Sequence, residues 1–196
     1  MGSTAGTDVA AADRPMRADA ARNRECLLVA ARAAFTEKGS AASLEDIARR
    51  ADVGVGTLYR HFPTRQALLE AVYVGEVEAL CRSAADFDEV SPWDALVLWF
   101  DRFVDYVATK KALVDEMMAT VGKDAPVFRT CHEAIFSAGE PLLAAAKTSG
   151  AVRDDVDFVD VIRLVSGISM IKNASADEIR RVLAVALDGL RYRADA

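Results

Sequence analysis

Apolar side chains recur every three or four positions along most of this chain, which is the spacing of helices with one buried face. Alternation of the kind that strands require is nearly absent. The pattern predicts an all-α protein with about nine helices, three in an N-terminal domain and six behind it. These helices are expected at residues 22–38, 43–52, 57–62, 64–82, 91–109, 110–121, 127–148, 158–171 and 175–193.

Helix-breaking residues modify this pattern in the second half of the chain. Gly139 and Pro141 lie inside 127–148 and are expected to kink or split that helix. A kink or short turn is expected near Lys110. Gly167 interrupts the apolar stripe of 158–171, where a missing side chain can let two helices approach closely.

The segment 43–62 predicts two short helices joined by a tight turn. In the first helix Leu44, Ile47, Ala48 and Ala51 share one face, and Ser43 is the expected N-cap. The sequence DVGVG at 52–56 is poor helix sequence, and its two glycines permit a sharp change of direction.

The second short helix ends before Pro63 and divides into an inner and an outer face. Leu58 and Phe62 point inward and, like Ile47 and Val53, are expected in the core. The polar side chains of the helix must point elsewhere; they are Thr57, Tyr59, Arg60 and His61. This arrangement is a helix-turn-helix, whose second helix can lie in a DNA major groove.

Three sequence blocks make the resemblance to a known family specific. They are AARAAFTEKG at 30–39, SLEDIARRA at 43–51 and GVGTLYRHFPTRQALLEAV at 54–72. In this order they resemble the DNA-binding domain of TetR-family transcriptional regulators, and the match covers about residues 22–72. The family commonly has Gly where Asp52 stands, but Asp also tolerates the left-handed backbone expected there.

The resemblance and the outer face together give the expected DNA contacts. Arg60 can pair with a guanine edge or hold a phosphate. Tyr59, His61, Arg65 and Ser43 match family positions that usually contact phosphates. The expected DNA-binding residues are Ser43, Thr57, Tyr59, Arg60, His61 and Arg65.

The net charge of −6 is divided unevenly along the chain. Residues 14–65 carry ten Lys/Arg and six Asp/Glu, a balance of +4, while the remaining residues carry 14 basic and 24 acidic groups, a balance of −10. This asymmetry suggests a mildly basic DNA-reading domain on an acidic body.

The rest of the chain is expected to form a helical effector-binding and dimerisation domain, residues 73–196. An apolar ligand pocket is expected among Trp99, Phe103, Tyr106, Met117, Phe128, His132 and Phe136, although the same side chains would equally fill a core. The last two helices carry more apolar surface than one buried stripe needs, because Val185 and Leu190 lie well around the helix from Val182. They are therefore expected to form a homodimer.

Several classes of protein are disfavoured by composition. No apolar run approaches the ~20 residues of a membrane span, and residues 1–21 have the small and polar composition of a flexible arm rather than an export signal. Three widely spaced cysteines suggest neither disulfides nor a metal site, so the expected location is the cytoplasm, with no metal and no cofactor. No catalytic constellation occurs, and an enzyme is not expected.

The expected function is a ligand-responsive regulator, most simply a repressor that binds a palindromic operator as a homodimer and is released by a small apolar effector. Two alternatives stay open at this point. One is a transcriptional activator of the same fold. The other is a helical small-molecule-binding or interaction protein without DNA binding.

Overall fold

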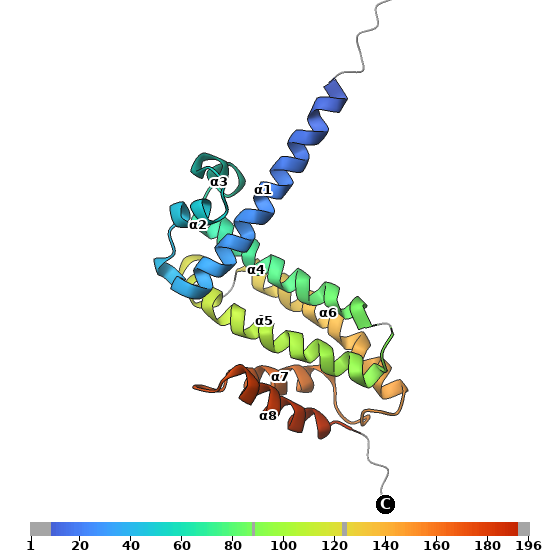
Figure 1. The fold of residues 1–196 in the computed structure, drawn as a ribbon. Coiled ribbons are helices and arrows are strands. Elements are labelled where there is room, and N and C mark those ends of the chain that lie inside the picture. The colour runs from blue at the N-terminus through green and yellow to red at the C-terminus, as the bar shows by residue number, and fades with distance from the viewer. Residues whose placement is uncertain (1–8, 88, 123–124, 192–196) are drawn as a thin grey trace, which may run out of the picture. The chain divides into compact units, whose positions relative to one another are not determined.

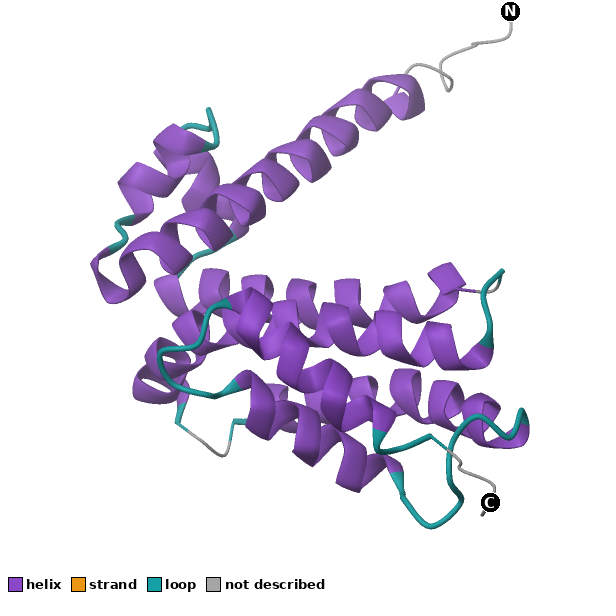
Figure 2. Cartoon of the chain, turned by 60° about the horizontal axis from the view of Figure 1, so that its bottom comes forward, coloured by secondary structure: helices purple, strands orange, loops and turns teal. Residues whose placement is uncertain are grey.

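The computed structural model describes residues 9–87, 89–122 and 125–191, and the regular elements within these residues are all helices (Figure 1; Figure 2). The predicted all-α class is therefore confirmed. The elements are α1 (Val9–Lys38), η1 (Gly39–Ala41), α2 (Leu44–Arg50), α3 (Val55–His61), α4 (Arg65–Arg82), η2 (Ser83–Phe87), α5 (Pro92–Val121), α6 (Pro126–Thr148), α7 (Phe158–Ser169) and α8 (Ala176–Asp188), where η marks a short 3₁₀-helix.

The chain divides into two compact units, Met1–Val72 and Tyr73–Ala196. The first contains α1, α2 and α3, and the second contains α5 to α8. Helix α4 begins in the first unit and ends in the second. None of the helices in the described residues is both long and apolar enough to cross a membrane.

Helix α5 accounts for the difference between the nine expected helices and the eight α-helices found in the described residues. It continues through Lys110 without the expected turn. Helix α6 likewise continues through Gly139 and Pro141; of the predicted kink or split, the split does not occur. The missing Pro141 N–H would have bonded to the carbonyl of Ser137, and Ser137 is exposed, so water can serve that carbonyl instead.

Both ends of the helical region differ from the prediction. Helix α1 begins at Val9, so residues 9–21 of the expected flexible arm are helical, while residues 1–8 lie outside the described part. Alanine, the best helix former, is frequent in this segment. Helix α8 ends at Asp188 with Gly189 as its C-cap, earlier than the predicted residue 193, which is outside the described residues.

The core of the first unit comes from one face of each of its helices. Phe35 of α1, Ile47 of α2 and Leu58 of α3 are fully buried, and Phe62 nearly so. Val53 is only half-buried. The inward face predicted for the two short helices is thus confirmed, apart from the partial exposure of Val53.

The core of the second unit is a cluster of aromatic rings on α5 and α7. The ring of Trp99 lies 5.3 Å from that of Phe100 and 6.0 Å from that of Phe158, and the indole N–H donates to the carbonyl of Leu80 at 3.2 Å. A Cβ on Gly139 would lie 2.2 Å from a Phe158 ring carbon and 2.7 Å from a Trp99 ring carbon. The close approach of helices therefore occurs at Gly139.

Gly167 was also expected to let two helices approach closely, but no such approach occurs there within the described residues of one chain. A Cβ added there would meet no atom within 4 Å. Sequence alone cannot distinguish these two glycines, because the distance to a neighbouring helix depends on residues far away along the chain.

We expect Gly139→Ala to lower the free energy of unfolding by ~1 to 3 kcal/mol, because the added methyl must displace two packed rings. The matched control is Gly75→Ala in α4, where a Cβ meets nothing within 4 Å. The control should be neutral or stabilising by up to ~1 kcal/mol through helix propensity. Chemical denaturation measures both, and an equal or higher midpoint for Gly139→Ala than for Gly75→Ala would contradict the packing argument.

Candidate functional site

The first helix of the motif, α2, starts at a side-chain cap. Ser43 accepts a hydrogen bond from the backbone N–H of Asp46 at 3.0 Å, as predicted. Its hydroxyl is exposed, and its proton can still be donated. Ser43 therefore both starts the helix and presents a donor at the surface.

Asp46 connects the start of α2 to basic residues on two helices. Its carboxylate accepts from Lys38 of α1 at 3.0 Å, from Arg50 at 3.1 Å and from Arg49. The hydrogen bond from Lys38, followed by the charges of Arg50 and Lys38, lowers the pKa of the Asp46 carboxyl. Folding lowers this pKa, so the carboxylate stabilises the folded unit above its unfolded pKa of about 4, and this contribution is lost as the pH falls through the folded value.

The turn of the motif depends on Asp52, which has a φ of 54°. The N–H of Asp52 bonds to the carbonyl of Arg49 at 3.2 Å, and the N–H of Val53 bonds to the carbonyl of Ala48 at 3.0 Å. These two bonds form a Schellman motif, which satisfies the last carbonyls of α2 and reverses the chain. The left-handed backbone that the sequence predicted at this turn is therefore confirmed at Asp52.

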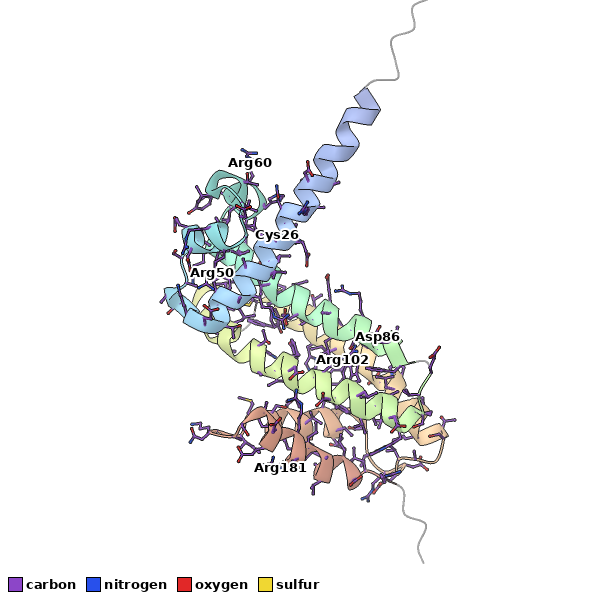
Figure 3. All side chains as sticks on the ribbon, viewed as in Figure 1. Cys26, Arg50, Arg60, Asp86, Arg102 and Arg181 are labelled. Carbon is purple, nitrogen blue, oxygen red and sulfur yellow. The ribbon has the colours of Figure 1, made fainter. Side chains whose placement is uncertain are left out.

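Helix α3 exposes the side chains that were predicted to read DNA. Tyr59 is 44% exposed, Arg60 is exposed, and Thr57 and His61 are half-buried. Arg60 has no hydrogen bond or ion pair within the described residues, and its side chain is labelled in Figure 3 at the outer side of α3. The helix therefore presents a tyrosine and an arginine on its outer face, supported by the buried Leu58.

Arg65, also predicted to contact DNA, has a structural role in the first unit. Its guanidinium donates to the carbonyls of Gly39 at 3.3 Å, Ser40 at 3.2 Å and Ala42, and it lies 5.0 Å from the centre of the Phe35 ring. These carbonyls follow the end of α1, where the helix itself offers no donors. Sequence reasoning missed this role, because residues 39–42 are distant from Arg65 along the chain.

A cavity of about 380 Å³ lies among α5, α6 and α7 in the second unit. Its volume falls within the range of small-molecule sites. It is lined by Phe103, Tyr106, Val107, Lys110, His132, Ile135, Phe136, Ile162, Arg163, Ser166 and Met170.

Four of the seven predicted pocket residues line the cavity, namely Phe103, Tyr106, His132 and Phe136. The other three lie elsewhere. Trp99 and Met117 are buried, and the ring of Phe128 packs against that of Tyr73 at 5.6 Å. The polar lining was missed, although Phe103, Tyr106 and Lys110 follow one another at helical spacing on α5.

Tyr106 also connects the cavity to α4. Its hydroxyl lies 3.4 Å from the hydroxyl of Tyr73. Burial raises the pKa of both tyrosines, so both remain protonated at neutral pH. A side chain that lines the cavity is therefore in polar contact with the helix that continues from the first unit.

The outer sides of α7 and α8 expose several apolar side chains. Val185 is 76% exposed and Val182 44%, and Leu164 and Met170 are also exposed. Leu190 is buried, contrary to the expectation that it adds to the excess apolar surface. On its inner side α8 is held to α5 by Arg180, which donates to Asp101 at 2.8 Å.

No group of three or more His, Cys, Asp or Glu side chains within the described residues is arranged to hold a metal ion.

Comparison with known proteins finds the same organisation in relatives. The family model of bacterial regulatory proteins of the tetR family matches residues 27–72, and the model of the C-terminal domain of SbtR-like transcriptional regulators matches residues 91–192. Among curated proteins, the HTH-type transcriptional regulator UidR of Escherichia coli strain K12 is 26% identical over 183 residues, covering 90% of this chain and 93% of UidR.

Two solved structures are similar over nearly their whole length. The TetR transcriptional regulator SCO0520 from Streptomyces coelicolor is 39% identical, with a TM-score of 0.79, over 87% of this chain and 99% of that one. The TetR transcription regulatory protein from Mycobacterium vanbaalenii is 36% identical, with a TM-score of 0.76, over 91% of this chain and all of that one.

We expect Arg65→Ala to lower the stability of the first unit by ~1.5 to 3 kcal/mol, because it leaves backbone carbonyls without a charged donor. The control is Arg60→Ala, which removes an arginine without a partner in the described residues and should change stability by less than ~0.5 kcal/mol. Thermal unfolding followed by circular dichroism measures the difference. Equal melting temperatures for the two variants would show that the Arg65 contacts do not stabilise the unit.

Proposed function

This chain belongs to the TetR family of transcriptional regulators and has the family's helix-turn-helix DNA-binding domain, and from this premise we propose that it is a repressor. It binds a near-palindromic operator as a homodimer and leaves the operator when a small molecule binds. The observation that carries the DNA-reading part is the outer face of α3. It combines an exposed arginine without a protein partner in the described residues with an exposed tyrosine, on a helix whose opposite face is buried.

The DNA contacts divide into base reading and phosphate contact. Arg60 reaches base edges in the major groove, where a bidentate pair with guanine distinguishes one base from another. Ser43, Thr57, Tyr59 and His61 contact the phosphates that position the helix. Arg65 is proposed to contact a phosphate in addition to the backbone carbonyls that it holds, so its replacement changes stability as well as DNA affinity.

We expect Arg60→Ala to cost ~1 to 3 kcal/mol of operator binding and to relax base preference at one position of each half-site. Fluorescence anisotropy with duplexes selected from genomic DNA measures this, and wild-type affinity should fall steeply with salt. The matched control is Arg129→Ala, which removes an exposed arginine of α6 in the second unit and should leave operator binding unchanged. A folded Tyr59→Ala, Arg60→Ala double variant with unchanged affinity would overturn the DNA-reading assignment.

The dimer is proposed to form through α7 and α8. The exposed valines and Leu164 form apolar surface on the two helices, and pairing the same helices from a second copy would remove it from water by a two-fold contact. A two-fold dimer would place two copies of α3 in successive major grooves, about 34 Å apart. The operator is therefore expected to be a near-palindrome.

We expect Val185→Asp to give a folded monomer and to weaken operator binding at least tenfold, because it buries a charge in the proposed interface. Val185 is suited to the test because it is exposed in one chain, whereas Ile168 and Leu187 are buried and their replacement by Asp would unfold the unit. Val90→Asp, at an exposed loop valine, is the control. A Val185→Asp protein that sediments as a dimer at micromolar concentration contradicts this interface.

Effector release is proposed to act through Tyr106 and Tyr73. A ligand in the cavity contacts Tyr106, whose hydroxyl neighbours that of Tyr73 on α4, and α4 carries the chain into the DNA-binding unit. A ligand that favours another pose of α4 changes the separation of the two reading helices, and a coupling of ~1 to 3 kcal/mol lowers operator affinity about 5- to 150-fold. A ligand that binds the cavity but leaves operator affinity unchanged would refute this coupling.

A further inference from the structure

The cavity of the second unit has a chemical asymmetry. Most of its wall is aromatic or aliphatic, but Lys110 of α5 and Arg163 of α7 both line it, and no carboxylate does among the described residues. Met170 and Arg163 are exposed, so this edge of the cavity meets solvent. The charge of the cavity is therefore positive, although the unit as a whole is acidic.

Lys110 lies at the cavity wall without an acidic partner among the described residues. Its ammonium lies 5.8 Å from the centre of the Tyr106 ring, and no carboxylate of the described residues is within ion-pairing distance of it or of Arg163. Burial lowers the pKa of the Lys110 ammonium, because part of its hydration is lost, and no described carboxylate replaces that water.

We propose that the effector bound in this cavity is an organic carboxylate with an apolar, aromatic-sized body. The body packs among Phe103, Tyr106 and Phe136, and the carboxylate accepts hydrogen bonds from Lys110, with Arg163 as the second cation at the open edge. This inference rests on the proposed effector site, and it specifies the charge of the molecule that enters it.

The surrounding backbone favours a carboxylate over a more highly charged phosphate. Phe103, Tyr106 and Lys110 lie inside α5, and His132 and Phe136 lie inside α6, where backbone N–H groups are bonded within the helix. Phosphate sites usually add several backbone donors to their cations. Here only side chains can donate, which suits a single negative charge on an apolar body.

The test compares two probes of the same shape that differ in charge, 2-naphthoate and 2-naphthamide. Isothermal titration calorimetry with the full-length protein should show naphthoate binding about tenfold more tightly than the amide. Lys110→Met should abolish this preference while still binding the amide, and Lys110→Arg should retain it. Arg163→Gln, at an exposed position, should reduce the preference.

The matched control is Lys147→Met, which removes a lysine of the same unit that donates to the carbonyl of Asp154 and lies outside the cavity. It should preserve the preference for naphthoate. Equal binding of the two probes by the wild-type protein would overturn the proposal, as would failure of both probes to bind at millimolar concentration. If Lys110→Met does not fold, the proposal is still decided by the binding of the two probes to the wild-type protein and to Arg163→Gln.

Measurements on the same protein samples distinguish a failure of the carboxylate assignment from a failure of the proposed repressor function. Operator affinity is measured first without any probe. Absence of operator binding would overturn the proposed function while the preference for naphthoate still stood, whereas normal operator binding with no preference would overturn only the assignment of a carboxylate.

Discussion

The second unit depends on the packing of Trp99 against Gly139. The indole is fully buried, lies over the position where α6 lacks a side chain, contacts Phe158 of α7 and donates to the carbonyl of Leu80 on α4. One side chain of α5 therefore fixes the separation of three other helices. Because protein interiors are close-packed, a displacement of one of these walls has to be accommodated by the others.

The cavity lies along α5 where this packing stops. Phe103 is one turn beyond Trp99, and its ring still contacts the indole ring at 6.0 Å, but it also borders empty space. Tyr106 and Lys110 continue the same side of the helix and bring polar atoms to the wall. The proposed effector site is therefore an extension of the core, with a rigid aromatic end and a charged open end.

The DNA-binding unit has to stabilise two very short helices. Helices α2 and α3 have seven residues each, too few to be stable alone, and they depend on the Ser43 cap, the turn at Asp52 and burial against α1. Arg65 adds a clamp on the carbonyls that follow α1. With the inner faces of both helices buried and both ends of α2 stabilised in this way, Arg60 can be exposed without a partner in the described residues.

The sequence by itself determined the features that need only near neighbours: the helical class, the cap at Ser43 and the left-handed turn at Asp52. It also determined the family, because the motif is a contiguous pattern. Tertiary structure decided which glycine permits close packing, that Arg65 binds backbone carbonyls, and which aromatic residues line the cavity rather than the core. Periodicity identifies the buried face of a helix, but what that face meets depends on helices far away in sequence, and only their packing determines whether a side chain meets another side chain or an empty space.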